Sequence, residues 1–182
     1  MAKTLRNFDL LMLNEAFEVA KKSLAEKRKV GAVIVDLASE SIISKGHNKM
    51  FGELNFSLCE NHLGESYECV IHAEELAIIN MFKLPNYSES ISKHVKTIYC
   101  TYSPCMNCCK MIAHAGIKRL VYCEEHKTNF VSSEIENGYS PLEFLQEMGI
   151  EVVKYNKATI CNTFVSPIKP RKKYKERVKK TA

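Results

Sequence analysis

The chain has 182 residues, a length that predicts a single domain with a full hydrophobic core. Apolar residues make up 46% of it and it holds only seven Gly and five Pro, a composition that excludes a disordered or fibrous protein. The net charge of +5 arises at the end of the chain: residues 169–182 hold eight Lys or Arg and one Glu, which leaves −2 for residues 1–168. We therefore expect a folded domain over residues 1–168 and a flexible basic tail over residues 169–182, and the acidic body weighs against a nucleic-acid partner.

The first half of the chain predicts two helices separated by a hairpin and a long loop. Apolar residues recur every three or four positions after Asp9, which is the expected N-cap of the first helix. Two short runs rich in β-branched residues follow it, as in a β-hairpin. In chain order, the expected elements are a helix over residues 9–27, strands over 30–36 and 41–46, a loop over 47–70 and a helix over 72–82.

The second half of the chain alternates strands with helices. Gly116 and Gly149 mark helix ends, and Ser140 followed by Pro141 marks a helix start. The expected elements are strands over residues 93–102, 118–123 and 150–155, helices over 105–115 and 140–148, and a polar loop over 124–139. This order predicts an α/β fold, a three-layer α/β/α sandwich with a five-stranded mixed sheet in which the first two strands are antiparallel and the later ones favour parallel pairing.

Eight cysteines occur in a chain that shows no export signal. Its first residues lack the charged, apolar and small-residue order of a signal peptide, and no apolar run approaches the roughly 18 residues of a membrane span. We therefore expect a cytoplasmic protein with no membrane partner. Because the cytosol keeps thiols reduced, the cysteines are expected to be thiols or metal ligands.

Two short motifs open two of the predicted helices. The sequence HAE stands at residues 72–74 and the sequence PCMNC at residues 104–108. Two cysteines three positions apart at a helix start direct both sulfurs to one side, as they do in zinc sites. With His72 they make three ligands for Zn²⁺, which leaves the fourth tetrahedral position for water. Bound zinc lowers the pKa of that water to about 7, and Glu74 stands where it can carry the proton.

Together the two motifs match H-x-E…P-C-x-x-C, the signature of zinc-dependent nucleobase deaminases. The chain resembles the cytidine and deoxycytidylate deaminase superfamily from about Val30 to Val153, most closely the deoxycytidylate (dCMP) deaminases, including those of bacterial viruses. The family folds as a five-stranded sheet between helices, in agreement with the element order. Beyond the zinc motif, the resemblance rests on KVGAVIVD, GHN, TIYCTYSPCMNCCKMIAHAGIKRLVYCEE and GIEV, which begin at residues 29, 46, 97 and 149.

The resemblance implies roles for seven residues. By position, these are the zinc ligands His72, Cys105 and Cys108, the general acid/base Glu74, and the substrate-binding residues Asn48 through its side chain, Ala73 through its backbone N–H and Ser103 through its backbone carbonyl. The resemblance also implies a small nucleotide as substrate and assembly as a homo-oligomer.

The expected activity is hydrolytic deamination of dCMP to dUMP, which supplies thymidylate synthesis. Two alternatives stay open at this point. One is a deaminase that acts on a base in tRNA or single-stranded DNA and uses the basic tail as a phosphate-binding arm. The other is a zinc-stapled binding module without turnover, which would need neither an open coordination position nor Glu74.

The remaining polar and sulfur-containing candidates form three sets. One set either binds a second, structural zinc or packs as ordinary side chains. A second set is expected to be small core residues, and a third either lines the substrate pocket or forms a solvated loop. They are Cys59, His62, Cys69 and His94 for the second zinc, Cys100, Cys109 and Cys123 for the core, and Tyr122, Glu124, Glu125 and His126 for the pocket.

Overall fold

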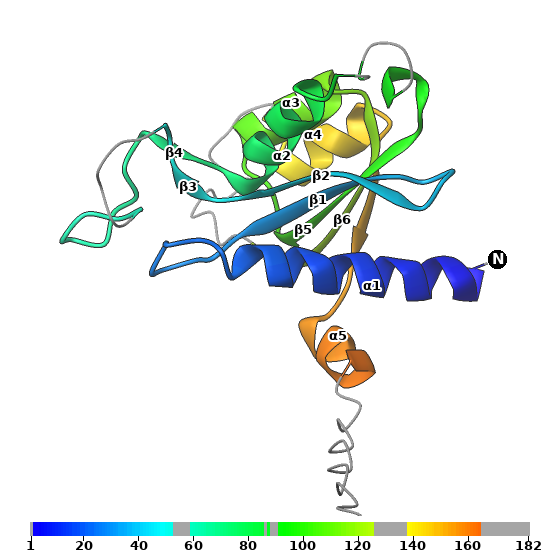
Figure 1. Cartoon of the computed structure of the whole chain (residues 1–182), viewed down its shortest axis with the longest axis horizontal. Helices are drawn as coiled ribbons and strands as arrows, with labels where there is room; N and C mark the ends of the chain where they lie inside the picture. Colours follow the sequence, from blue (N-terminus) through cyan, green and yellow to red (C-terminus); the bar gives the residue numbers. More distant parts are fainter. Residues whose placement is uncertain (1, 53–58, 86, 88–90, 126–137, 165–182) are drawn as a thin grey trace, which may run out of the picture.

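A five-stranded sheet forms the middle layer of the computed structural model (Figure 1). The structure describes residues 2–52, 59–85, 87, 91–125 and 138–164. The sheet consists of β1 (Gly31–Asp36), β2 (Ser41–His47), β5 (Lys96–Tyr102), β6 (Ile117–Glu124) and β7 (Glu151–Lys154), in the spatial order β2-β1-β5-β6-β7. A ribbon of two short antiparallel strands continues from the end of β2: β3 (Lys49–Met50) and β4 (Val70–Ile71).

The connections between the strands explain their directions. Strand β1 pairs antiparallel with β2 through a short turn, and it also pairs antiparallel with β5. Strands β5, β6 and β7 run parallel, which requires long crossovers between them. Two helices supply these crossovers, α3 (Met106–His114) and α4 (Pro141–Glu147). The predicted fold class, a three-layer α/β/α sandwich with a five-stranded mixed sheet, is confirmed.

Helices cover both faces of the sheet (Figure 1). Helices α2, α3 and α4 lie on one face, and α1 and α5 lie on the other. The bounds not yet given are α1 (Ala2–Ala20), α2 (Ala73–Phe82), α5 (Lys157–Phe164) and a 3-10 turn, η1 (Ile91–Lys93). No helix in the described part of the chain is long and apolar enough to cross a membrane.

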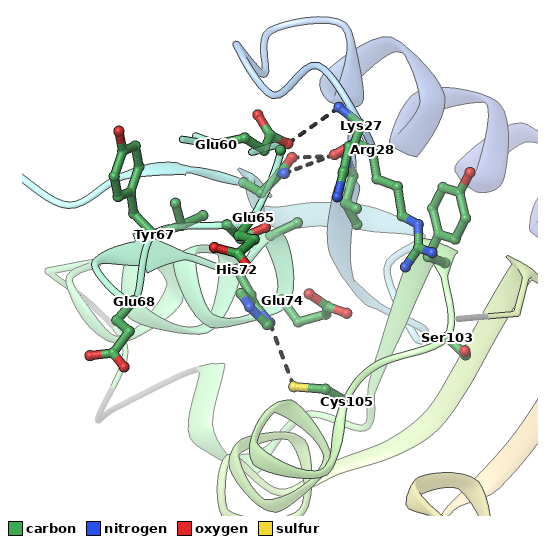
Figure 2. Close-up of a pocket in the computed structure, with 17 residues that line it drawn as sticks. Lys27, Arg28, Glu60, Glu65, Tyr67, Glu68, His72, Glu74, Ser103 and Cys105 are labelled. Atoms are coloured by element: carbon green, nitrogen blue, oxygen red, sulfur yellow. Dashed lines mark hydrogen bonds between the residues drawn. The ribbon is translucent and has the colours of Figure 1, made fainter. Parts of the chain in front are cut away.

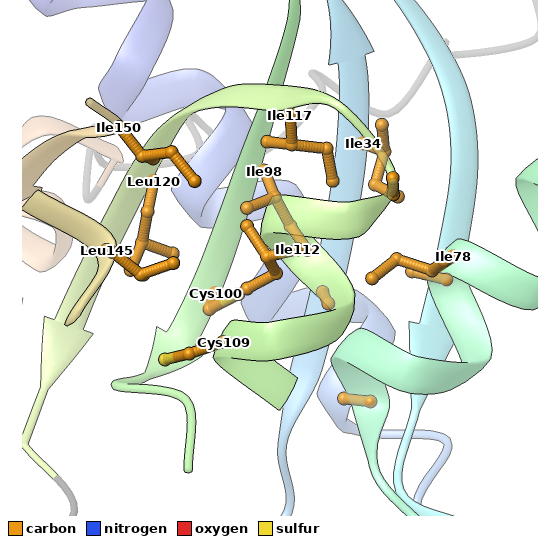
Figure 3. Packing of buried hydrophobic residues seen from close by; sticks show 14 of the residues in the cluster. Ile34, Ile78, Ile98, Cys100, Cys109, Ile112, Ile117, Leu120, Leu145 and Ile150 are labelled. Atoms are coloured by element: carbon orange, nitrogen blue, oxygen red, sulfur yellow. The ribbon is translucent and has the colours of Figure 1, made fainter. Parts of the chain in front are cut away.

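Successive residues of β1 point into two different cores. Ala32 and Ile34 pack on the side of α2 and α3, whereas Val33 and Val35 pack on the side of α1. Because both faces of the strand are buried, its sequence is a continuous apolar run without polar alternation. Figure 3 shows the first of these cores, in which Ile112 of α3 packs over the sheet.

Helix α1 begins at Ala2, so the prediction that Asp9 is its N-cap is wrong. Asp9 lies in the middle of α1 and its side chain is buried. Its carboxylate accepts hydrogen bonds from the guanidinium of Arg119 at 2.7 and 2.9 Å. The hydroxyls of Tyr99 and Tyr155 donate to the same carboxylate at 2.9 and 3.0 Å. The charged group therefore anchors α1 to the sheet, and no local pattern indicates this because its partners lie 90 to 146 residues away.

Helix α1 ends at Ala20, before the predicted end at Lys27. The hydroxyl of Ser23 accepts a hydrogen bond from the backbone N–H of Ala25 at 3.1 Å and donates to the carbonyl of Asn48 at 2.8 Å. A serine hydroxyl bonded to nearby backbone groups offers the chain an alternative to the helix. Residues 21–30 consequently form a non-helical segment that leads into β1.

Four elements within the described residues were not predicted: β3, β4, η1 and α5. The loop expected over residues 47–70 contains the β3–β4 ribbon, and helix α5 follows β7. The side-chain oxygen of Asn156 accepts the backbone N–H of Ala158 at 2.9 Å, which is the contact of a helix cap. The predicted tail over residues 169–182, the domain boundary at residue 168 and His126 lie outside the described residues.

Replacing Asp9 with alanine is expected to lower the free energy of unfolding by about 3–5 kcal/mol, because the buried guanidinium of Arg119 loses its charged partner. The control is Glu151→Ala, which removes a carboxylate that also binds Arg119 but has a side chain 62% exposed. For this variant we expect a loss of at most about 1 kcal/mol. Urea unfolding of both variants beside the parent measures the difference, and equal losses would contradict the anchoring role of Asp9.

Candidate active site

Two helices begin side by side and bring three sequence-predicted ligands together. His72 is the N-cap of α2, and Cys105 is the N-cap of α3; both have extended backbone angles. Cys108 lies one turn into α3 and is buried. One ring nitrogen of His72 and the two sulfurs all lie within 4.8 Å of one another. Residues from sequence positions more than 30 apart thus form one cluster.

The separations within this cluster fit a tetrahedral metal ion. Nδ1 of His72 lies 3.5 Å from Sγ of Cys105 and 3.4 Å from Sγ of Cys108. With Zn–S bonds of about 2.3 Å and Zn–N bonds of about 2.0–2.1 Å, tetrahedral geometry puts a sulfur and a nitrogen ligand about 3.6 Å apart. Histidine and cysteine are also donors that zinc prefers. Three protein donors leave a fourth position open to water.

The surroundings of the cluster favour negative charge on the sulfur of Cys105, whereas the hydrogen bond with Cys105 and burial raise the pKa of Cys108. The pKa of Cys105 is lowered to about 3, chiefly by the hydrogen bond from the Cys108 thiol and also by His72. The pKa of His72 is raised to about 9, chiefly by its hydrogen bond with Cys105. Cys105 also stands at the N-terminus of α3, where the helix dipole stabilises an anion. Since thiolates are the form of cysteine that binds metal, the cluster is suited to a cation.

Glu74 lies beside the cluster. It is 4% exposed, and its Oε2 lies 3.8 Å from Sγ of Cys108. Burial raises the pKa of Glu74 to about 7. A carboxyl group that titrates near neutral pH can both accept and release a proton there. Figure 2 shows Glu74 next to His72 at the pocket.

A pocket of about 500 Å³ opens onto the cluster (Figure 2). This volume lies within the range of small-molecule sites, roughly 300–1,000 Å³. All the predicted site residues except the buried Cys108 line it, namely Asn48, His72, Ala73, Glu74, Ser103 and Cys105. The lining also includes charged and aromatic residues that belong to neither sequence motif: Lys27, Arg28, Glu60, Glu65, Tyr67, Glu68 and Tyr102. Of these, the cationic pair was detectable in the sequence as a basic run just before the first strand.

The Asn48 side chain holds the backbone of this basic run. Its Oδ1 accepts the backbone N–H of Val30 at 2.8 Å, and its Nδ2 donates to the carbonyl of Arg28 at 2.9 Å. The side chain therefore has a structural task at the pocket wall in addition to the substrate contact that the family resemblance implies.

Gly46 on β2 allows the start of α2 to lie close to the sheet. A methyl group at this position would come within 2.2 Å of the carbonyl oxygen of Ala73 and 2.4 Å of the backbone nitrogen of Ala77. Any side chain here would push the first turn of α2 away from the sheet. Because His72 and Glu74 belong to that turn, the glycine helps to set their positions.

The candidate ligands of a second zinc do not come together. Among the described residues, the cluster at the pocket is the one group of histidine, cysteine and acidic side chains with metal-binding separations. Cys59 is buried, whereas Cys69 is exposed. Nδ1 of His94 instead lies 3.1 Å from the carboxylate of Asp36. The alternative prediction, that these side chains pack individually, describes the structure better.

The residues expected either to line the substrate pocket or to form a solvated loop make contacts with other side chains. The carboxylates of Glu124 and Glu125 pair with Lys157 and Lys154, each at 2.6 Å, and the hydroxyl of Tyr122 donates to Glu125 at 3.4 Å. None of these side chains lines the pocket at the metal cluster as the described residues define it. As expected for core residues, the remaining predicted cysteines are buried: Cys100, Cys109 and Cys123.

The fold and the cluster together define the class of protein, a zinc-binding deaminase domain. A sequence model of the cytidine and deoxycytidylate deaminase zinc-binding region matches residues 6–124. This match covers well over half of the chain and includes the three cluster residues and Glu74. The chain belongs to the cytidine and deoxycytidylate deaminase family, and the prediction of zinc as its metal is confirmed.

Individual relatives agree with this assignment. The deoxycytidylate deaminase of Enterobacteria phage T4 is 40% identical over 90 residues, which are 50% of this chain and 40% of that protein. A tRNA-specific adenosine deaminase of Rickettsia bellii is 32% identical over 111 residues, which are 60% of this chain and 66% of that protein. The chain thus spans less than two thirds of the length of these two relatives.

One solved structure is similar to this chain over almost the whole length of the solved protein. The dCMP deaminase from the cyanophage S-TIM5, in complex with dCMP and dUMP, aligns with a TM-score of 0.65 and 32% identity. The alignment covers 79% of this chain and 93% of that one.

Purified chain is expected to hold about one zinc ion, and Cys105→Ala is expected to lose most of it, because two remaining ligands hold zinc far more weakly than three. The matched control is Cys69→Ala, which removes an exposed thiol and should leave the zinc content unchanged. Metal analysis of the dialysed proteins measures both. Undiminished zinc in the Cys105 variant would contradict the cluster as the metal site.

Proposed function

We propose that the chain is a hydrolytic deaminase that converts dCMP to dUMP. The observation that carries the proposal is the pocket itself, in which the open three-ligand cluster and the buried Glu74 share one cavity with the cations Lys27 and Arg28. The similarity to the T4 and cyanophage enzymes, both of which are named for deamination of this nucleotide, supports it. The activity fits the further role of supplying dUMP for thymidylate synthesis.

In this mechanism, the zinc ligands are His72, Cys105 and Cys108. A bound zinc ion supplies the chemistry of lowering the pKa of a water molecule to about 7, so that hydroxide is available at neutral pH. Glu74 accepts the proton of that water and gives it to N3 of the cytosine ring as the oxygen adds to C4. The same carboxyl group then moves a second proton to the amino group, the C4–N4 bond breaks and ammonia leaves.

The other pocket residues orient the base and the sugar. The backbone N–H of Ala73 holds the pyrimidine carbonyl, and the backbone carbonyl of Ser103 accepts a hydrogen bond from the departing ammonia. Among the described contacts of Asn48, one of its two amide N–H bonds is used by the carbonyl of Arg28. The second is available to a sugar hydroxyl.

The charges of the pocket favour a single phosphate over a polynucleotide. Lys27 and Arg28 come from the segment before β1 and can form charge-assisted hydrogen bonds with one phosphate group. Glu65 and Glu68 come from the segment before β4 and line the same pocket. The pocket thus holds carboxylates as well as cations, and like charges at close range are unfavourable for a ligand with many phosphates.

Ammonia release from a panel of substrates tests the proposal. The panel holds deoxycytidine, dCMP, dCTP and cytidine, with a tRNA anticodon stem–loop and a single-stranded DNA for the alternative, deamination within a nucleic acid. The highest kcat/KM is expected for dCMP, with a mild dependence on salt. Turnover of a nucleic acid but not of dCMP, with affinity falling steeply with salt, would overturn the proposal in favour of that alternative. No turnover of any substrate by the zinc-loaded chain would favour the binding module.

Glu74→Gln is expected to retain zinc and fold but to lower kcat by about 10²–10⁴-fold, because the amide cannot carry the proton. The matched control is Glu18→Gln at an exposed position on α1, which should keep the parent's kcat. Steady-state kinetics together with metal analysis measures both variants. Activity of the Glu74 variant within a few-fold of the parent would show that another group moves the proton.

A further inference from the structure

Glu60 is a buried acidic residue whose carboxylate binds backbone. It is 8% exposed, and its two oxygens accept the N–H groups of two consecutive residues, Glu26 at 3.0 Å and Lys27 at 3.3 Å. Burial of an ionised carboxylate is costly unless hydrogen bonds replace its water. Glu60 therefore ties the segment before β1 to a segment 33 to 34 residues further along the chain.

The segment that carries Glu60 is held firmly by its own hydrogen bonds. The side-chain oxygen of Asn61 accepts the backbone N–H groups of Leu63 and Glu65, each at 2.9 Å. The backbone N–H of Tyr67 donates to the carbonyl of Cys59 at 3.1 Å, and Glu60 and Ser66 form a β-bridge. A side chain on a segment closed in this way is a fixed point to which a second segment can be attached.

The same segment lies beneath the side chain of Lys27. A methyl group at Gly64 would come within 3.0 Å of Cε and 3.3 Å of Nζ of that lysine. Gly64 also has a φ of 74°, a conformation that other residues rarely adopt. The segment over residues 59–68 thus fixes the backbone of Lys27 through Glu60 and leaves room for its side chain at Gly64.

Glu60 and Asn48 hold adjacent parts of the segment before β1. Glu60 binds the N–H groups of residues 26 and 27, and Asn48 binds the carbonyl of Arg28 and the N–H of Val30. Figure 2 shows the contacts of Glu60 with Lys27 on the side of the pocket where Arg28 also lies. These hydrogen bonds fix four backbone groups of the segment. The positions from which the side chains of Lys27 and Arg28 extend are therefore fixed as well.

We propose that Glu60 is a positioning residue for recognition of the substrate's phosphate: it holds Lys27 and Arg28 where they meet that phosphate at the mouth of the pocket. This inference rests on the proposed function, since it takes a nucleoside monophosphate as the substrate. Preorganised donors bind more tightly because they lose less conformational freedom on binding. Because the proposal gives the two cations contacts with the phosphate, we expect the effect to be confined to substrates that carry one.

Charge alone predicts the opposite result, which makes the proposal easy to test. Glu60 carries a negative charge close to two cations, so its removal should strengthen phosphate binding if only the net charge matters. If positioning dominates, its removal should weaken phosphate binding. The sign of the change in KM for dCMP therefore distinguishes the two explanations.

The experiment compares zinc-loaded parent, Glu60→Ala and Glu60→Gln with dCMP and deoxycytidine as substrates. For Glu60→Ala we expect a KM for dCMP about tenfold higher, with kcat for dCMP and kcat/KM for deoxycytidine within about twofold of the parent. Glu60→Gln keeps one of the two acceptor oxygens, so a smaller rise of about threefold is expected. It also provides the comparison if the alanine variant does not fold.

The matched control is Glu18→Gln, which removes a carboxylate from an exposed position on α1 outside the lining of the pocket. Its KM for dCMP should equal that of the parent. A KM for dCMP that is unchanged or lower in both Glu60 variants would overturn the proposal, as would an equal loss with dCMP and deoxycytidine. Hydrogen exchange of the amides of Glu26 and Lys27 should be faster in Glu60→Ala than in the parent.

The outcome separates this inference from the proposed function. A parent protein that does not deaminate dCMP contradicts the proposed function, whatever the Glu60 variants do. A parent that deaminates dCMP, with faster amide exchange in Glu60→Ala but no change in KM, contradicts the positioning role alone.

Discussion

The site depends on one constraint: the first turns of α2 and α3 must begin next to each other at one edge of the sheet. His72 and Cys105 are 33 residues apart in sequence, yet their donor atoms lie 3.5 Å apart. Strand β5 delivers α3 to this edge, and Gly46 on β2 lets the start of α2 lie against the sheet. The sheet order, the close packing at the glycine and the two extended N-caps all serve this meeting of helix ends.

The buried ionisable groups of this protein differ in how fully neighbouring groups pair with them. Asp9 and Arg119 neutralise each other, and the ammonium group of Lys96 donates to three backbone carbonyls, those of Ile91, Ser92 and His94. These charged groups have ionic or hydrogen-bonding partners, and the contacts stabilise the fold. Glu74, in contrast, makes a long contact of 3.8 Å with Cys108, and its burial raises its pKa to about 7. A buried carboxyl group with a pKa near neutral pH thus lies beside the metal cluster.

Local patterns were sufficient to predict much of the fold and the position of the cluster. The apolar run before Asp36, the glycines at 116 and 149 and the two motifs at helix starts each act within a few residues of sequence, so each can be recognised without coordinates. The buried role of Asp9 and the anchoring contact of Glu60 depend on partners 33 or more residues away, and nothing nearby in sequence indicates them. The substrate contacts of Asn48, Ala73 and Ser103 stay predictions, because they involve a molecule outside the chain.

The long sequence separations also have a kinetic consequence. The Arg119–Asp9 pair joins residues 110 apart, and the hydroxyl of Thr101 accepts the backbone N–H of Gly31 from 70 residues away. Folds dominated by such distant contacts form slowly, since each contact closes a long loop. During that time His72 is separated from both cysteines, and no three-ligand site exists. Zinc therefore binds the folded chain in preference to the unfolded one, so free metal in the cell acts as a ligand that shifts the folding equilibrium towards the native state.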